Sequence, residues 1–343
     1  MSVAKVDKDG GYPDERGAGR LDKDRDYRGA YPDESGAGRL DLKEATGPRI
    51  EADAAAEQAM FRRPSEWRIF WEAFSRDRLA VGAAAVIGLV CLASVLAPIL
   101  SPYDPTVGDN SLRLAPIGTL GHVLGLDGQG RDILSRLLWG GRVSLIIALL
   151  PVAVASVISV LLGLVAGFAG GKVDMIIMRT LDVFFAFPAV LLAVAIAGVL
   201  GPGMLNVMLS LTIVLVPYIS RVAYMATVTV KNELFVDQAR VSGARPAQIL
   251  FHHILPNTLS PVIVYGSTLV GIMIVLGAGL SFLGLGITPP RPDWGIMCAD
   301  GRNFLSVAPH VSAVPGIVLI LVAMSFNIVG DGLRDALDPK LRK

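Results

Sequence analysis

The sequence predicts an all-α integral membrane protein with six transmembrane helices, preceded by a disordered N-terminal tail. The 343-residue chain is 52% hydrophobic and only 18% charged, whereas soluble domains carry about 25% charged residues. Six apolar runs each reach the length of about 20 residues that a helix needs to cross a bilayer. Charged residues are crowded into the first part of the chain, to about Arg78. Together these observations exclude an ordinary soluble domain.

Residues 1–60 are expected to form a disordered cytoplasmic tail, because they are polar and rich in Gly, Pro and Asp. The tail contains a repeat: YPDERGAGRLD at Tyr12–Asp22 returns as YPDESGAGRLD at Tyr31–Asp41. Two copies are too few for a solenoid, which needs at least about three. We interpret the repeat as a duplicated solvated tail, with a docking peptide as the alternative. The start of the chain lacks the apolar core of a cleavable signal, so insertion depends on the internal spans.

Residues 61–78 are predicted to form an amphipathic interfacial helix. Four aromatic residues recur at positions i, i+3, i+4 and i+7, the spacing of one helix face; they are Trp67, Phe70, Trp71 and Phe74. Two tryptophans on such a helix, just before a span, favour the membrane interface.

The first predicted transmembrane helix covers residues 79–100, and an extracytoplasmic segment follows over 101–143. Residues 144–343 hold the other five spans. The six predicted spans are Leu79–Leu100, Ser144–Phe168, Thr180–Leu200, Met204–Thr227, Leu259–Phe282 and Val311–Val329. Prolines in or near five of them favour kinks, because proline removes a helical hydrogen bond; they are Pro151, Pro188, Pro217, Pro261 and Pro315.

Lysine placement predicts the orientation. After the tail, all lysines fall on the side of the membrane that also holds the N-terminus; they are Lys172, Lys231, Lys340 and Lys343. By the positive-inside rule this side is cytoplasmic. Both termini are therefore expected in the cytoplasm.

A polar segment, residues 233–257, separates the fourth and fifth predicted spans. Gly243 fits the residue after a helix C-terminus, where a left-handed backbone favours glycine. Pro246 fits the first turn of a second helix, and Pro256 is expected to break that helix before the next span. The segment is thus predicted to form two short helices at a fixed angle, which project into the cytoplasm and fit a groove on a partner.

This segment resembles the EAA signature of permease subunits of ABC importers, which reads Glu-Ala-Ala, three residues, Gly, nine residues, then Ile-x-Leu-Pro. Asp237-Gln238 replaces Glu-Ala, and His253 occupies the Ile position, next to Ile254. The resemblance implies a set of ATPase-coupling residues: Asp237, Gln238, Ala239, Gly243, Ile254, Leu255 and Pro256.

Four other segments resemble C-type permease subunits of dipeptide, oligopeptide and nickel importers; they are Asp127–Leu145, Met178–Pro188, Ser281–Gly295 and Gly330–Arg342. The resemblance implies a type I ABC importer transmembrane domain in a bacterial or archaeal cytoplasmic (inner) membrane, with 144–343 as the permease core. It implies a non-catalytic subunit that imports peptides; nickel and glutathione are the alternative solutes within the family.

The implied partners are a second, B-type permease subunit, two cytoplasmic ABC ATPase subunits and an extracytoplasmic substrate-binding protein. ATP and Mg are expected on the ATPases and no cofactor in this chain, since the sequence has no G-x-x-x-x-G-K-[ST] motif. The four histidines are scattered and no His/Cys ligand cluster occurs, so no metal site is expected.

Two further groups of residues are candidates. Asp182 is an intramembrane acid, and such residues face the protein interior or find a partner; Arg179 or Arg221 is expected to pair with it. The pair either fixes helix packing or belongs to the substrate pathway, for which Tyr218 and Asn327 are also candidates. On the outer side, binding-protein docking is expected at Arg131, Asp132, Asp293 and Trp294.

Two other functions stay open. A secondary transporter driven by an ion gradient would favour a membrane-embedded acid cluster and broken half-helices at the midplane. A membrane scaffold without transport would explain the spans and the tail, but not the projecting helix pair.

Overall fold

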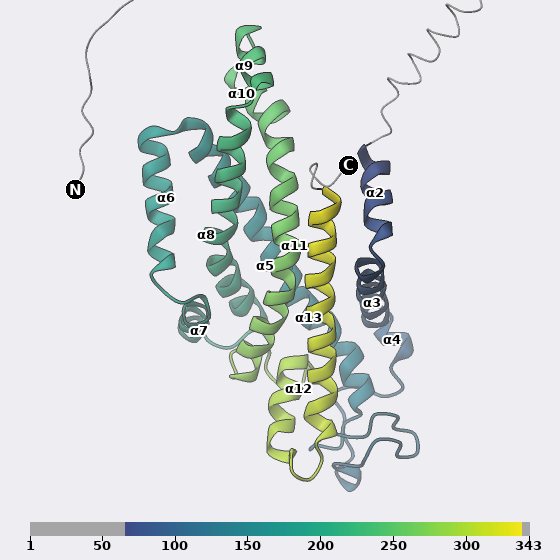
Figure 1. The fold of residues 1–343 in the computed structure, drawn as a ribbon. Coiled ribbons are helices and arrows are strands. Elements are labelled where there is room, and N and C mark those ends of the chain that lie inside the picture. The colour runs from purple at the N-terminus through teal and green to yellow at the C-terminus, as the bar shows by residue number, and fades with distance from the viewer. Residues whose placement is uncertain (1–65, 338–343) are drawn as a thin grey trace, which may run out of the picture. The chain divides into compact units, whose positions relative to one another are not determined.

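The computed structural model describes residues 66–337, which form helices joined by loops and contain no β-strand (Figure 1). The predicted tail, with its repeat, lies outside the described residues. Five helical segments are long and apolar enough to cross a membrane: α3 Arg78–Val95, α5 Ile133–Ala169, α8 Met204–Lys231, the segment Pro246–Phe282 that contains α11 Leu255–Phe282, and α13 His310–Leu337. A bent pair, α6 Gly171–Phe185 and α7 Ala189–Leu200, is the sixth span if it is counted as one. The predicted all-α membrane class is confirmed.

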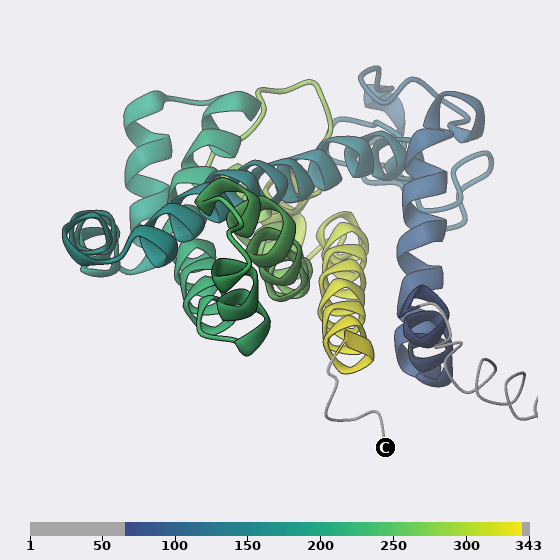
Figure 2. The same cartoon turned by 90° about the horizontal axis from the view of Figure 1, so that it is seen from above.

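The shorter helices lie at the ends of these spans and in the loops. They are α2 Glu66–Arg76, α4 Ala97–Leu100, η1 Asn110–Leu112, α9 Leu234–Val241, α10 Pro246–Gln248, η2 Ile249–Ile254, α12 Trp294–Gly301 and η3 Arg302–Phe304. The helices α9 and α10 lie at one end of the bundle, here called the α9 end, and α12 lies at the other, here called the α12 end (Figure 1). Viewed from above, α6 and α3 lie on opposite sides (Figure 2).

The third predicted span, Thr180–Leu200, is wrong as a single helix. The helix α6 begins earlier, at Gly171, and ends at Phe185, and α7 is bent from it by 88°. Pro188 explains the break, because it lacks an N–H and disfavours the helical conformation of Phe187. A helix of 15 residues is ~22 Å long, which is shorter than the ~30 Å hydrocarbon core. Asp182, which the prediction placed near the start of the span, therefore lies in the last turn of α6.

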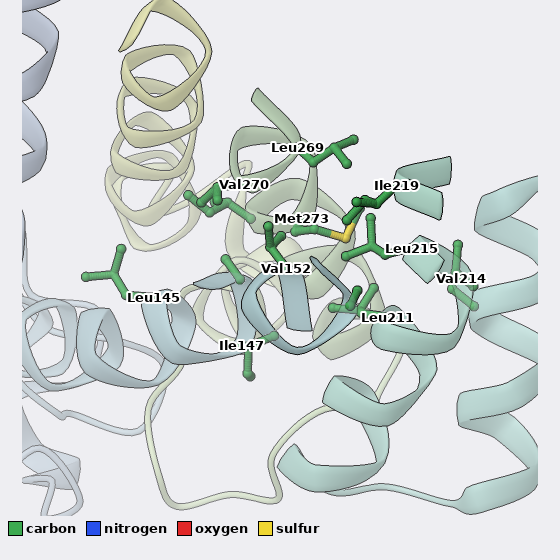
Figure 3. Close-up of a cluster of buried hydrophobic side chains, with 14 of the residues drawn as sticks. Leu145, Ile147, Val152, Leu211, Val214, Leu215, Ile219, Leu269, Val270 and Met273 are labelled. Atoms are coloured by element: carbon green, nitrogen blue, oxygen red, sulfur yellow. The ribbon is translucent and has the colours of Figure 1, made fainter. Parts of the chain in front are cut away.

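The core is a seam in which α5 packs along α8 and α11 (Figure 3). Apolar side chains from all three helices meet there, among them Ile147, Val152, Leu211, Leu215 and Met273. Glycine brings α5 close to α8: a Cβ at Gly163 would lie 2.5 Å from the Cβ of Ala223. Between helices in lipid, such close packing replaces the hydrophobic effect as the source of stability.

The predicted amphipathic helix is present as α2. Phe70 and Phe74 are buried against Ala80 of α3 and Ala336 of α13, whereas Trp71 is exposed. Asp77 caps α3 by accepting hydrogen bonds from the N–H groups of Leu79 and Ala80. One side of α2 therefore packs on protein, and the interfacial position of the helix stays a prediction.

Candidate functional site

The polar segment between α8 and α11 projects at the α9 end (Figure 1). Gly243 ends α9 with a φ of +82°. Its N–H donates to the carbonyl of Arg240 (3.1 Å), and the N–H of Ala244 donates to the carbonyl of Ala239 (3.0 Å). These two bonds form a Schellman motif, which satisfies the last carbonyls of the helix. The predicted role of Gly243 as a left-handed helix terminator is confirmed.

The second arm also begins as predicted. The N–H of Arg245 donates to Gln248 Oε1 (2.9 Å), and Pro246 occupies the first helical turn. The expected break at Pro256 is wrong, because the helix continues from Pro246 to Phe282.

A π-helical turn just before Pro256, η2, allows the helix to continue through the proline. In η2 the N–H of Leu255 donates to the carbonyl of Leu250, five residues back, which is the hydrogen bond of a π-helix. Just after Pro256, the side chain of Asn257 donates to the carbonyl of His253 (2.7 Å). The second arm is therefore continuous with α11 as one helical segment.

The inner face of the projecting segment is buried. Val236, Ile249 and Ile254 are each at most 2% exposed. Of the predicted coupling residues, Asp237, Gln238, Gly243 and Pro256 are exposed, Ala239 and Leu255 are partly buried, and Ile254 is fully buried. Ile254 thus positions the segment and has no surface for a partner.

The outer face carries apolar residues that the sequence analysis missed. Leu234 is 78% and Val241 89% exposed, and Phe235 and Phe251 are also exposed. A salt bridge of 3.0 Å between Asp237 and Arg240 lies on the same helix, α9. The signal available in the sequence was the presence of large apolar residues in an otherwise polar segment. An exposed apolar tip rimmed by charges is typical of a protein-binding surface.

At the α12 end, a buried charged cluster joins the segment before α5 to α12. Arg131 Nε lies 2.7 Å from Asp127 Oδ2, and Arg131 Nη2 lies 3.2 Å from Asp300 Oδ2. Arg136 Nε lies 3.4 Å from the same oxygen of Asp127. Asp127 also accepts hydrogen bonds from the backbone N–H groups of Gln129 and Arg131. Each buried charge thus has an opposite partner, which a buried ion needs.

Asp132 caps α5. It accepts from the backbone N–H of Ser135 (2.7 Å), and His122 Nδ1 lies 2.9 Å from its other oxygen. Asp293 caps α12 and accepts from Ser144 Oγ (2.8 Å), and Trp294 Nε1 donates to the carbonyl of Leu137 (3.0 Å). The contacts of Asp293 and Trp294 hold α12 against α5.

Direct docking contact by the four predicted residues is not supported, because none of them is more than 3% exposed: Arg131, Asp132, Asp293 and Trp294. They hold together the surface on which a partner would dock. Docking at this surface stays a prediction.

Burial raises the pKa of Asp293 above its usual value. A raised folded-state pKa means that the folded protein binds the proton more tightly than the unfolded chain, so stability rises as the pH falls through that pKa. We expect wild type to gain stability relative to Asp293→Asn as the pH is lowered from about 8 to about 5, because only wild type takes up a proton at this position. Unfolding midpoints of both proteins in detergent across this pH range measure the effect.

Asp109→Asn is the matched control for this pH dependence. Hydrogen bonds from Ser111 lower the pKa of Asp109, so the stability that its charge provides is lost only when the pH falls below the ordinary carboxyl range of about 4. Between about pH 8 and about pH 5, the stability of Asp109→Asn relative to wild type should therefore stay constant. A gain of wild type over Asp109→Asn in this range, or no gain over Asp293→Asn, would contradict the assignment.

The predicted intramembrane ion pair is present. Arg221 Nη2 on α8 lies 2.7 Å from Asp182 Oδ1 on α6, and Arg179 Nη1 lies 3.6 Å from Asp182 Oδ2. Tyr218 lies next to the pair, with its ring 4.8 Å from that of Phe185. Asn327 is elsewhere: its Oδ1 is buried where α13 meets α11 and has no hydrogen-bond partner among the described residues.

Among the described residues, no group of three or more His, Cys, Asp or Glu side chains is arranged to hold a metal ion. The fold and the site thus define a class: a multi-pass helical membrane protein that presents a rigid projecting tip, continuous with a span, at one end.

Comparison with known proteins gives the family. Residues 159–343 match the model of the binding-protein-dependent transport system inner membrane component, and residues 65–116 match that of the N-terminal TM domain of oligopeptide transport permease C. The glutathione transport system permease protein GsiD of Pectobacterium atrosepticum is 42% identical over 276 residues, which cover 80% of this chain and 92% of that protein. The di/tripeptide transport system permease protein DppC of Pseudomonas aeruginosa is 38% identical over 84% of this chain and 97% of its own length. The dipeptide permease DppC of Alkalihalophilus pseudofirmus is 38% identical over 85% and 96%.

The chain belongs to the family of binding-protein-dependent transport system inner membrane components. It is a permease subunit of the ABC importer type, as the resemblance of its coupling segment implies.

Proposed function

We propose that this permease subunit imports short peptides, driven by ATP that two cytoplasmic ATPase subunits hydrolyse with Mg. The main support is that α9, whose outer face is exposed, packs against η2, and that the helix containing η2 continues into α11. Closure of the ATPases would move the tip of this subunit, and the continuous helix would transmit this movement to the membrane-spanning bundle.

The orientation follows from the same proposal. The α9 end lies in the cytoplasm with both termini, as the lysine placement predicts. The coupling surface consists of the exposed coupling residues named above together with Leu234, Phe235, Val241 and Phe251. A B-type permease subunit completes the pathway, and a substrate-binding protein docks at the α12 end, over the surface that Arg131 and Trp294 hold in place.

The names of the relatives support a peptide as the solute. Two of them are permeases for dipeptides or for di- and tripeptides, and one is for glutathione. Glutathione, itself a tripeptide derivative, is the second candidate. A gradient-driven transporter is disfavoured, because Asp182 is neutralised by Arg221 and Arg179 and does not belong to a cluster of acidic side chains among the described residues.

A pull-down from gentle detergent tests the coupling surface. We expect wild type to retain the ATPases and Leu234→Asp/Val241→Asp to lose them, because the variant places two charges in an apolar contact. Both side chains are exposed, so the chain itself should fold. Mass spectrometry of the co-purified proteins is the readout.

Leu120→Asp/Val307→Asp is the control. These residues are 99% and 77% exposed in loops of the α12 end, so the ATPases should remain bound. Retention of the ATPases by Leu234→Asp/Val241→Asp would refute the coupling surface, and their absence from the wild-type preparation would refute the ABC mechanism.

A further inference from the structure

A cavity of about 430 Å³ opens at the α12 end, between the segment before α5 and the helices α12 and η3. We call it the arginine pocket. Among the described residues that line it, only Ala299 and Phe304 have apolar side chains. Its polar lining consists of Arg113, Gln129, Arg131, Asp300, Arg302 and Asn303.

Three contacts hold the two sides of the arginine pocket in place. The salt bridge of 3.2 Å between Arg131 and Asp300 joins the segment before α5 to α12. The ring of Phe304 lies against Gly128 so closely that a Cβ at Gly128 would overlap it. Arg113 Nε donates to the carbonyl of Gly128 (2.7 Å), which fixes the guanidinium group. The pocket is therefore preorganised, and preorganisation lowers the entropy cost of binding.

Positive charge exceeds negative charge around this pocket. The buried cluster described above balances itself, because two arginines pair with two aspartates. Arg113 and Arg302 are additional, and neither forms a salt bridge with a described residue. The guanidinium carbon of Arg302 lies 5.4 Å from the ring centre of Phe282. The exposed acids of the same end, Asp104 and Asp109, line other cavities, so the surplus charge of the pocket stays uncompensated.

The lining decides which anion fits. Guanidinium groups match a carboxylate with parallel, charge-assisted hydrogen bonds, and the amides of Gln129 and Asn303 can add further hydrogen bonds. A lipid headgroup would also need an apolar groove for its acyl chains, which this lining does not provide. Arginine is enriched in protein–protein interfaces. These features favour an acidic side chain of a protein.

We propose that the arginine pocket receives an acidic side chain of the substrate-binding protein, which Arg113 and Arg302 hold by charge-assisted hydrogen bonds. The inference rests on the proposed function, which places the binding protein at the α12 end, and it adds the residues and the chemistry of the contact. The buried residues of the same end do not touch the partner directly. They keep the two sides of the pocket at the distance that the carboxylate needs.

The first test measures docking of the purified binding protein on the assembled importer in lipid nanodiscs, by surface plasmon resonance. We expect Arg113→Gln/Arg302→Gln to weaken docking at least about tenfold, mainly through faster dissociation, because charge-assisted hydrogen bonds are lost. Both side chains are exposed, so the chain should fold. Retention of the ATPases and of the second permease in the variant complex verifies this. Unchanged docking by this variant would overturn the proposal.

Arg142→Gln/Arg291→Gln is the matched control. These two arginines lie at the same end but line a separate cavity beside Trp139, so the control removes the same charge and leaves the arginine pocket intact. At physiological ionic strength, charges more than about 8 Å away are largely screened. We expect the control to weaken docking by less than about threefold. Equal losses in both variants would mean that the overall field acts and not the pocket, and would overturn the proposal.

The second test identifies the occupant. Gln129, which is exposed in the lining, is replaced by the photo-crosslinking residue benzoylphenylalanine in the assembled importer, and the complex is irradiated together with the binding protein. We expect an adduct with the binding protein, at a peptide that contains an aspartate or a glutamate. Exchange of that acid for lysine should restore docking to Arg113→Glu/Arg302→Glu. An adduct with the second permease or with lipid instead would overturn the proposal.

The two tests separate this inference from the proposed function. If the wild-type importer binds the binding protein and takes up peptide, but docking is indifferent to Arg113 and Arg302, only the arginine pocket fails. If the binding protein does not dock on the wild-type importer and no peptide enters, the proposed function fails together with the pocket. Uptake of a radiolabelled dipeptide into vesicles that contain the wild-type complex distinguishes the two cases.

Discussion

Asp127→Ala is expected to destabilise the protein by about 3–5 kcal/mol, the usual effect of removing one partner of a buried ion pair. The change leaves the guanidinium groups of Arg131 and Arg136, which are 4% and 2% exposed, with only the partly exposed Asp300 as a counter-charge. It also removes the acceptor of two backbone N–H groups. The unfolding midpoint of the detergent-purified chain measures the loss.

Asp104→Ala is the control for this prediction. Asp104 lies in the same segment and accepts hydrogen bonds from Thr106, but it is exposed, so its removal should change the unfolding midpoint far less than Asp127→Ala does. Equal midpoints for Asp127→Ala and Asp104→Ala would mean that the buried cluster does not hold the α12 end together. The predicted loss would also remove the docking surface, and hence binding-protein-dependent uptake.

Gly243→Leu is expected to reduce uptake and substrate-stimulated ATP hydrolysis on the order of tenfold, with little change in membrane insertion. A Cβ at Gly243 would meet no atom within 4 Å, so the effect does not come from a clash. It comes from the φ of +82°, which costs an ordinary residue about 1–2 kcal/mol. The chain avoids this strain by changing the angle between α9 and α10, which misplaces the tip.

Gly243→Asn separates strain from size. Asparagine has nearly the shape of leucine but tolerates the left-handed conformation, so uptake should stay close to wild type. Uptake is measured in vesicles that contain equal amounts of inserted complex. Normal uptake by Gly243→Leu, or equal losses in both variants, would show that the angle of the tip does not control coupling.

The sequence by itself determined the features that depend on local physics. The length of each apolar run predicted the membrane class, because about 20 apolar residues suffice to cross a bilayer. Gly243 and Pro246 predicted the end of α9 and the start of α10, because the backbone preferences of glycine and proline act within one turn. The partner of Asp182 was also foreseen, because few charges are available at that depth.

Only the tertiary structure decided which polar residues are buried. Asp293 and Trp294 looked like loop residues open to a partner, but their hydrogen bonds reach α5, roughly 150 positions earlier in the chain, and no local pattern encodes such a distance. The helix also continues past Pro256, because a π-turn before the proline rearranges the hydrogen bonds that a local rule assumes lost. The bend at Pro188, conversely, divides a run that composition alone joins. Burial and depth depend on contacts between spans, so the structure was needed to determine them.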